Sequence, residues 1–456
     1  MSHVAVIDIG KTNAKLALVD RQSLTEIAVV TRPNTVIDAP PWPHFDIEGH
    51  WTFLLEALAG FHADHGIAEI SITTHGASIT LIDANGDLAA PMLDYEHKGP
   101  DDLAVEYDAI RPPFSETGSA RLSMGLNVGA QLYWQFKTDP SLAARTAWVL
   151  TYPQFWAFRL TGIAATEVTS LGCHTDLWNP HAKTPSSLAA KLGIDQKLAP
   201  VRPADEALGP IHPTIARQTG LDPATQVRCG IHDSNASLLP HLLCRKAPFS
   251  VVSSGTWVIA MAVGGKPVTL DPARDTLINV NAMGDPVPSA RFMGGREHDL
   301  ATGGTCPDPT DADIQTVLVE RAMLLPAIVP ETGPFQGKQS TWIKEPKANT
   351  GRRNAAVSFY LALVTAHCLE LVGHQGPIIV EGPFAKNRCY RLMLAEATGS
   401  EVQATASTTG TSQGAALLGA KTAQARTETA TTQPAPPDLA EKLTAYADQW
   451  RAQAEQ

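Results

Sequence analysis

Short apolar runs alternate with amphipathic segments along the chain. Residues 3–9 (HVAVIDI) form an apolar run, a turn containing Gly10 follows, and residues 14–20 (AKLALVD) resume the apolar pattern. Two such runs separated by a few Gly, Thr and Asn residues predict a β-hairpin. Apolar residues then recur at helical spacing from Trp51 to Phe61, which predicts an amphipathic helix.

The second half of the chain repeats this arrangement. Residues 249–265 (FSVVSSGTWVIAMAVGG) again predict a strand, a Gly/Thr turn and a second strand. Strands alternating with helices in both halves predict an α/β protein, and the repeated hairpin indicates two related lobes. The other expected elements are strands at 69–76, 77–87 and 378–387, and helices within 128–162 and at 352–373 and 388–398.

The length of 456 residues allows two or three domains of about 150 residues each. We expect an N-terminal lobe at 1–244 and a C-terminal lobe at 245–421. Residues 422–437 are polar and contain prolines, which predicts a linker. A terminal helix is expected at 438–456.

The composition excludes several classes of function. There are 35 Lys and Arg against 46 Asp and Glu, for a net charge of −11, and binding to nucleic acid or an anionic membrane needs basic patches. The chain has no apolar run of 18 residues and its first residues do not resemble a secretory signal, so we expect a cytoplasmic protein without a membrane span. Six scattered cysteines without a C-x-x-C predict reduced thiols.

The residues Gly10-Lys11-Thr12 resemble the end of a Walker A loop, but their surroundings do not fit one. The first glycine of that motif would be residue 5, which is Ala5, and a strand follows where the motif needs a helix. A hairpin that binds phosphate fits better, because Gly10 allows an anion to approach the backbone. The residues that supply this chemistry are Asp8, Gly10, Thr12, Asn13 and Lys15 in the first hairpin and Ser253, Ser254, Gly255 and Thr256 in the second.

Several motifs, in order along residues 10–420, resemble those of the FGGY-type carbohydrate kinases, a branch of the actin-like, sugar-kinase and heat-shock ATPase superfamily. The phosphate motifs of that family resemble DIGKTNAK (8–15) and SSGTW (253–257), and its catalytic segment resembles GIHDSNA (230–236). VEGPFAKN (380–387) stands where the adenosine motif lies, and GTSQGAALLGA (410–420) matches the closing helix. The resemblance implies two ribonuclease-H-like lobes with a central cleft, with the sugar bound mainly by the N-terminal lobe and ATP by the C-terminal lobe.

The resemblance also implies roles for individual residues. Asp233 would accept the proton of the sugar hydroxyl, unless it serves only as a helix N-cap, and Asp8 would hold Mg²⁺ through water. His75, Tyr95 and Asp233 would contact the sugar. The residues expected to bind ATP are Gly10, Thr12, Asn13, Lys15, Ser254, Gly255 and Thr256 at the phosphates and Gly382 and Asn387 at the adenosine.

Two segments bear on the substrate. PMLDYEHKG (91–99) places Tyr95, His97 and Gly99 where the family often has Trp, Asp and Arg, and RFMGGRE (291–297) resembles fuculose- and rhamnulose-kinase-like members. We therefore expect ATP- and Mg²⁺-dependent phosphorylation of a ketose or deoxyketose by a cytoplasmic enzyme that can form a homodimer. The alternatives are a kinase of the same fold for glycerol, another polyol or a sugar acid, and an actin- or chaperone-like nucleotide-gated module without sugar transfer.

Overall fold

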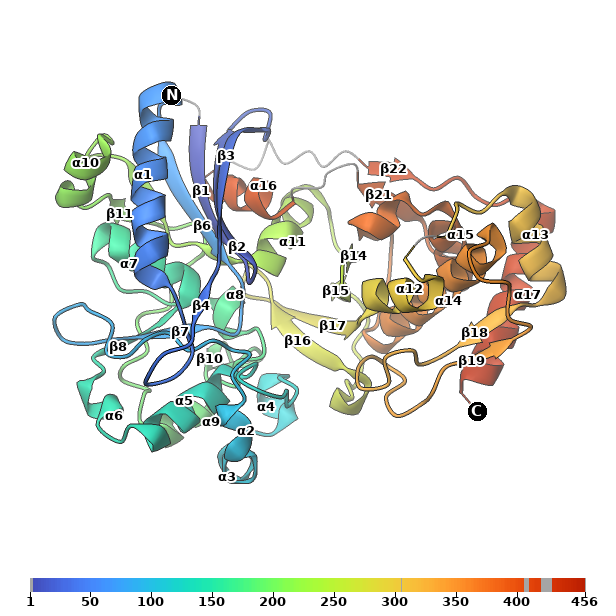
Figure 1. Cartoon of the computed structure of the whole chain (residues 1–456), viewed down its shortest axis with the longest axis horizontal. Helices are drawn as coiled ribbons and strands as arrows, with labels where there is room; N and C mark the ends of the chain where they lie inside the picture. The colour runs from blue at the N-terminus through green and yellow to red at the C-terminus, as the bar shows by residue number, and fades with distance from the viewer. Residues whose placement is uncertain (1–2, 305, 406–409, 420–428, 456) are drawn as a thin grey trace. The chain divides into compact units, whose positions relative to one another are not determined.

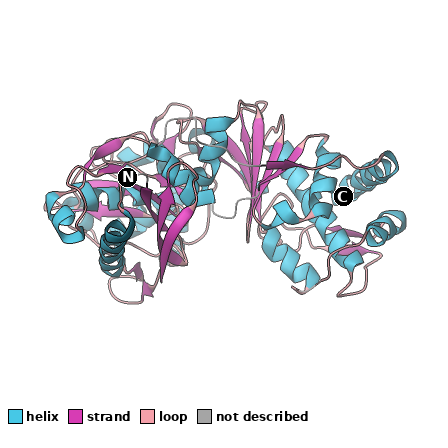
Figure 2. Cartoon of the chain, turned by 90° about the horizontal axis from the view of Figure 1, so that it is seen from above, coloured by secondary structure: helices cyan, strands magenta, loops and turns pink. Residues whose placement is uncertain are grey.

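The computed structural model describes residues 3–304, 306–405, 410–419 and 429–455, which form two compact units. Of these residues, the first unit contains the chain up to Cys244, Ile278–Pro286 and residues 410–419. The second unit contains Arg245–Leu277, the described residues from Val287 to 405, and those from 429 onward. Figure 2 shows strands and helices in both units, as expected for an α/β protein.

The main sheet of the first unit has the strand order β11-β12-β6-β1-β2-β3, with β13 also paired to β6. β1 and β2 form the predicted antiparallel hairpin, while β6 runs parallel to β1. The strands are β1 (His3–Ile9), β2 (Asn13–Asp20), β3 (Glu26–Pro33), β6 (Glu69–Thr74), β11 (Ala207–Pro210), β12 (Gln226–Arg228) and β13 (Ile231–His232).

Alternation along β1 assigns its side chains to two different cores. Ala5 and Ile7 belong to a core that includes residues of α1 (Ile47–His65) and α7 (Tyr152–Thr161). Val4 and Val6 belong to a second core with residues of α11 (Asp233–Cys244) and α16 (Gly410–Ala416), and Figure 1 shows α1 and α16 on opposite sides of the sheet. Because strand side chains alternate between faces, Asp8 lies on the α11 and α16 face.

The remaining elements of the first unit surround this sheet. The helices are α2 (Gly99–Asp102), α3 (Ala104–Ile110), α4 (Phe114–Thr117), α5 (Val128–Thr138), α6 (Leu142–Arg145), α8 (Val168–Leu171), α9 (Ser187–Lys191) and α10 (Pro213–Thr219), with the 3₁₀ turn η3 (Leu417–Gly419). The short strands are β4 (Val36–Ile37), β5 (His44–Phe45), β7 (Ile79–Ile82), β8 (Trp148–Thr151), β9 (Trp178–Asn179) and β10 (Thr184–Pro185). The expected helical stretch at 128–162 contains β8, whose partner β7 lies far away in the sequence.

A second sheet of the same design has the order β16-β17-β15-β14-β20-β21-β22, and its strands belong to the second unit except for the end of β16 and the first residue of β17. β14 pairs antiparallel with β15 and parallel with β20, as β1 pairs with β2 and β6. The two related lobes inferred from the repeated hairpin are thus confirmed. The strands are β14 (Phe249–Ser254), β15 (Val258–Val263), β16 (Thr276–Val280), β17 (Pro286–Phe292), β20 (Ile378–Glu381), β21 (Val402–Thr405) and β22 (Thr429–Thr431), with a separate pair β18 (Met323–Leu325) and β19 (Thr341–Ile343).

The core of the second unit includes α14 (Gly351–Leu371) and α17 (Pro437–Ala454). α14 is the one described helix long and apolar enough to cross a membrane by length and composition, and most of it is buried inside the protein. Its apolar character is therefore explained by core packing. The other helices are α12 (Gly294–Thr302), α13 (Asp311–Glu320) and α15 (Arg388–Thr398), with the 3₁₀ turns η1 (Pro272–Arg274) and η2 (Pro383–Lys386).

The structure corrects two expectations about the end of the chain. The closing helix α16 packs on α11 and β1 of the first unit, rather than within the lobe expected at 245–421. Part of the expected linker at 422–437 is strand β22, which pairs with β21. Without β22, β21 would be an edge strand with open backbone groups. Residues 422–428 lie outside the described residues. The six cysteines form no disulfide, as expected.

Candidate active site

The first hairpin turn is closed by its own backbone and held by Asn34. Gly10 N donates to Asn13 O at 2.9 Å. Asn34 Nδ2 donates to Gly10 O at 2.9 Å, and Asn34 N donates to Thr12 O at the same distance. The side chains of Thr12 and Asn13 stay exposed, so both can donate hydrogen bonds to a ligand.

Asp8 is the buried carboxylate beside this turn. Its Oδ2 accepts from Ser412 Oγ at 3.0 Å and lies 3.3 Å from Lys15 Nζ. Burial raises the pKa of Asp8, and the charge of Asp233 raises it further, while Lys15 and Ser412 act in the opposite direction. Asp8, Lys15 and Asp233 are therefore brought into one electrostatic cluster.

Asp233 begins helix α11, directly after the two-residue strand β13. Its Oδ1 accepts from Ser234 N at 2.6 Å and lies 3.3 Å from Nε2 of His232. Burial raises the pKa of Asp233, and the nearby His75 lowers it. The carboxylate thus accepts a hydrogen bond in the first turn of its own helix and interacts electrostatically with His75, so a role at the helix start does not compete with a catalytic one.

His75 and Tyr95, both expected near the sugar, lie together. Their ring centroids are 5.4 Å apart, and Phe45 lies 5.4 Å from His75. Burial lowers the pKa of His75 to about 4, so the ring is neutral near pH 7. Its Nδ1 lies 2.8 Å from Gly76 O and must carry the proton there, whereas the buried Nε2 has no hydrogen-bond partner among the described residues. That nitrogen is a free acceptor for a hydroxyl group.

Lys11 joins this group of side chains, which the sequence did not indicate. It forms ion pairs with Asp94 and, at 3.2 Å, with Glu96, and its Nζ lies 4.6 Å from the ring centroid of Tyr95. Lys11 therefore extends toward the residues expected to bind sugar. No local pattern in the sequence indicates this contact, because Asp94 and Glu96 lie more than eighty residues away.

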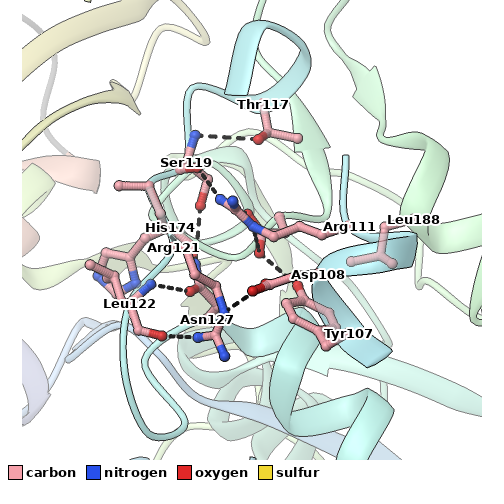
Figure 3. A network of polar contacts seen from close by, with 12 residues as sticks. Tyr107, Asp108, Arg111, Thr117, Ser119, Arg121, Leu122, Asn127, His174 and Leu188 are labelled. Carbon is pink, nitrogen blue, oxygen red and sulfur yellow. Dashed lines mark hydrogen bonds and ion pairs between the residues drawn. The ribbon is translucent and has the colours of Figure 1, made fainter. Parts of the chain in front are cut away.

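A polar network fixes the loop at residues 118–127 (Figure 3). Asn127 Nδ2 donates to Ala120 O and His174 O, both at 3.0 Å, and its Oδ1 accepts from Leu122 N at 2.7 Å. Gly125 N in the same loop donates to Tyr95 O at 2.9 Å. The network thus restrains the segment that carries Tyr95.

The second unit contains a pocket of about 1230 Å³, larger than most small-ligand pockets. Of the residues expected to bind ATP, Gly255, Thr256 and Asn387 line it. The pocket also has a cationic side chain, Arg296, that the sequence did not single out; it belongs to the RFMGGRE segment. The other lining residues are Gly295, His298, Asp299, Leu300, Gly303, Gly304, Pro383 and Phe384.

Other expected ATP ligands support this pocket through their side chains. Ser254 Oγ donates to Glu381 O and accepts from Phe384 N at 3.0 Å. Asn387 caps α15, with its Oδ1 accepting from Tyr390 N at 3.0 Å. Gly382 has φ +78°, and a Cβ there would lie 1.9 Å from the carbonyl oxygen of Ser254, so a glycine is required by both strain and space.

No group of three or more His, Cys, Asp or Glu suited to a metal occurs among the residues that the structure describes. A magnesium–nucleotide complex does not need such a cluster, because Mg²⁺ keeps several waters and uses one or two carboxylates with the phosphates. The carboxylate of Asp8 fits that requirement. Its contacts with Ser412 and Lys15 both fall on Oδ2, so neither of them uses Oδ1.

Two family profiles match the chain. "FGGY family of carbohydrate kinases, N-terminal domain" matches residues 3–240, and "Carbohydrate kinase FGGY, C-terminal domain" matches residues 246–429. Together with the two-unit α/β fold, these matches place the protein in the class of sugar kinases with an actin-like ATPase fold. The chain belongs to the FGGY family of carbohydrate kinases.

Individual relatives are more distant. The L-fuculokinase of Salmonella typhi is 26% identical over 274 residues, which cover 58% of this chain and 57% of that relative. The crystal structure of a carbohydrate kinase from Novosphingobium aromaticivorans matches with a TM-score of 0.92 and 36% identity, covering 100% of this chain and 98% of that one. The ligand-bound xylulose kinase of Lactobacillus acidophilus, at 15% identity and a TM-score of 0.80 with the same coverage, shows the fold alone.

Proposed function

We propose that the protein transfers the γ-phosphoryl group of ATP to a hydroxyl group of a small sugar, a ketose or deoxyketose. The observation that carries the proposal is the pairing of Asp233, a partly buried carboxylate, with a neutral histidine, His75, that interacts with it electrostatically and whose Nε2 is an open acceptor. One group can take a proton while the other orients a hydroxyl. The L-fuculokinase relatives support a deoxyketose substrate.

The proposed chemistry forms a bond between the sugar oxygen and the γ-phosphorus and breaks the bond between that phosphorus and the β–γ bridging oxygen. Asp233 accepts the hydroxyl proton, late in a loose transition state. His75 Nε2 accepts a hydrogen bond from a hydroxyl group, and Tyr95 lies against the same ring. Lys11 and its two carboxylate partners, Asp94 and Glu96, supply further polar groups for sugar hydroxyls.

We propose the hairpin turn of each unit as a phosphate-binding element and the pocket of the second unit as a nucleotide site. Gly10, Thr12, Asn13 and Lys15 are proposed for the phosphates with Gly255 and Thr256. The pocket lined by Asn387 is proposed for the adenosine, with Ser254 and Gly382 shaping it. Asp8 would hold Mg²⁺ through water, and the ion would neutralise phosphate charge. We place the enzyme in the cytoplasm and propose that it forms a homodimer.

The experiment is a screen of ketoses, deoxyketoses, polyols including glycerol, and sugar acids, with ADP release and the phosphorylated product both measured. We expect one ketose or deoxyketose to give the highest kcat/KM. A best substrate among polyols or sugar acids would replace the substrate class and keep the reaction. ATP hydrolysis that no acceptor stimulates would favour a nucleotide-gated binding module instead.

A further inference from the structure

Glu167 is a fully buried carboxyl group that the proposed chemistry does not use. It caps the short helix α8, where its Oε2 accepts from Thr169 N at 2.9 Å, from Ser170 N at 3.4 Å and from the Thr169 hydroxyl. Its Oε1 is buried without a hydrogen-bond partner among the described residues. Burial raises the pKa of Glu167 to about 7.

Such a group is costly for stability. A buried carboxyl loses its hydration, and an apolar side chain of similar size often packs there with no loss of stability. Local features that conflict with stability are expected at functional sites.

The hydroxyl of Thr169 connects Glu167 to the segment that carries Asp233. A hydroxyl has one proton to donate, and that of Thr169 is donated to Glu167. Its oxygen is then left to accept, and it accepts from the backbone N–H of His232 at 3.0 Å. The carboxyl group of Glu167 thus orients the acceptor that binds the residue immediately before Asp233.

The segment leading to Asp233 needs such support because it is barely a strand. β13 has two residues, His232 pairs with Thr74 at the end of β6, and Gly230 before it has φ +95°. Gln154 Nε2 donates to the carbonyl groups of Cys229 and Gly230, both at 3.0 Å. Side-chain hydrogen bonds therefore support the backbone just before β13 and at its last residue, His232.

We propose that Glu167 and Thr169 are positioning residues that hold the carboxylate of Asp233 in place through the backbone N–H of His232. Neither residue contacts the sugar or ATP in this proposal. Without the Thr169 oxygen, the N–H of His232 loses its acceptor and the start of α11 shifts. The expected fall in kcat rests on the proposed kinase function, whereas the expected displacement of Asp233 does not.

The kinetic test compares Thr169→Val, which keeps the shape and removes the oxygen, with Thr169→Ser, which keeps the oxygen. A displacement of about 1 Å can lower a rate by about 10²-fold. We expect Thr169→Val to lower kcat by at least about 10-fold with an unchanged KM for ATP, and Thr169→Ser to restore it. Thr166→Val is the matched control, because Thr166 Oγ1 is buried in the same region and donates to Ala199 O.

Glu167→Leu and Glu167→Gln separate positioning from stability. Leucine removes the acceptor, so kcat should fall, and it also removes the cap of α8, so the midpoint of thermal unfolding should fall as well. Glutamine retains an acceptor oxygen, so it should retain most of kcat. A Glu167→Leu variant that unfolds more easily and turns over at the wild-type rate would overturn the proposal, as would equal kcat values for Thr169→Val and Thr169→Ser.

Crystal structures of the wild-type protein, Thr169→Val and Thr169→Ser give a readout independent of turnover. We expect the carboxylate of Asp233 to be displaced in Thr169→Val and unmoved in Thr169→Ser. An unmoved Asp233 in Thr169→Val would overturn the proposal even if the rate fell. If the wild-type protein phosphorylates no acceptor, the proposed function fails, and a displaced Asp233 would still support the positioning role.

Discussion

Lys15 Nζ lies 3.3 Å from Asp8 Oδ2, and the two residues stand directly opposite each other in the register of β1 and β2. Glu26 on the neighbouring strand β3 also contacts Lys15, at 3.1 Å. The lysine is therefore held at the hairpin that we propose for the phosphates of ATP. Lys11, four residues earlier, points instead toward Asp94 and Tyr95.

The first prediction follows from this difference between the two lysines. We expect Lys15→Ala to lower kcat/KM for ATP more than Lys11→Ala does, because Lys15 stands beside the carboxylate proposed to hold Mg²⁺. Steady-state kinetics with varied ATP at saturating sugar measures this. If Lys11→Ala has the larger effect, the Walker-type interpretation of Gly10-Lys11-Thr12 must be reconsidered.

Lys11→Ala should instead weaken binding of the sugar. The substitution removes the cation between Asp94 and Glu96, leaving two carboxylates close together beside Tyr95. We expect the KM for sugar to rise by about 10-fold, as for a lost charge-assisted hydrogen bond. Lys137→Ala is the control, since Lys137 is an exposed lysine of α5 paired with Glu106; a similar rise in that variant would contradict the assignment.

Asp233→Asn should keep ATP binding and lose turnover. The amide cannot accept the hydroxyl proton, and general-base catalysis contributes roughly 10²-fold or more. We expect kcat to fall by at least about that factor, with the dissociation constant for ATP unchanged by calorimetry. Turnover close to that of the wild type would remove Asp233 from the mechanism.

Gly382→Ala should destabilise the second unit. The substitution adds strain at φ +78° and places a Cβ 1.9 Å from the carbonyl oxygen of Ser254. Gly399→Ala is the matched control, because Gly399 has φ +64° with no atom within 4 Å of the added Cβ, so it reports strain alone, about 1–2 kcal/mol. Urea unfolding should show a larger loss for Gly382→Ala, and equal losses would show that the close contact relaxes.

Glu167 predicts a pH dependence of stability. Its folded-state pKa is raised from 4.5 to about 7, so between these values the folded state binds more protons than the unfolded state. The contribution of Glu167 to stability therefore falls as pH rises from about 4.5 to 7, by roughly 3 kcal/mol. Glu167→Gln should remove this decline, which chemical unfolding at several pH values measures; parallel stability profiles for the two proteins would contradict the assignment.

Much of the fold could be predicted because its signals are local. The apolar runs flanking Gly10 and Gly255 are short, uninterrupted and separated by turn residues, so the two paired strands of each hairpin could be predicted. β8 was missed inside the expected helical stretch at 128–162, because its character depends on pairing with β7, more than sixty residues earlier. The strand β22 was missed for the same reason: its residues are polar and become a strand only at the edge of the sheet.

The candidate site shows the same division. Asp8, Asp233 and His75 could be proposed from the sequence because each stands in a motif of neighbouring residues. Lys11 received no role from the sequence, since its partners Asp94 and Glu96 lie more than eighty residues away. No sequence pattern pointed to Glu167, because its relation to Asp233 passes through a hydroxyl group and a backbone N–H.

The sequence by itself determined the α/β class, the repeated hairpins and the motifs that place Asp233 at the start of a helix. These depend on the alternation of apolar side chains and on turn residues, which act over a few positions. The tertiary structure decided that α16 packs beside β1, that Lys11 turns toward Tyr95 and that Thr169 supports His232. Such relations depend on which distant segments bury their surfaces together, and the burial that assembles them also raises the pKa of Asp8, Glu167 and Asp233.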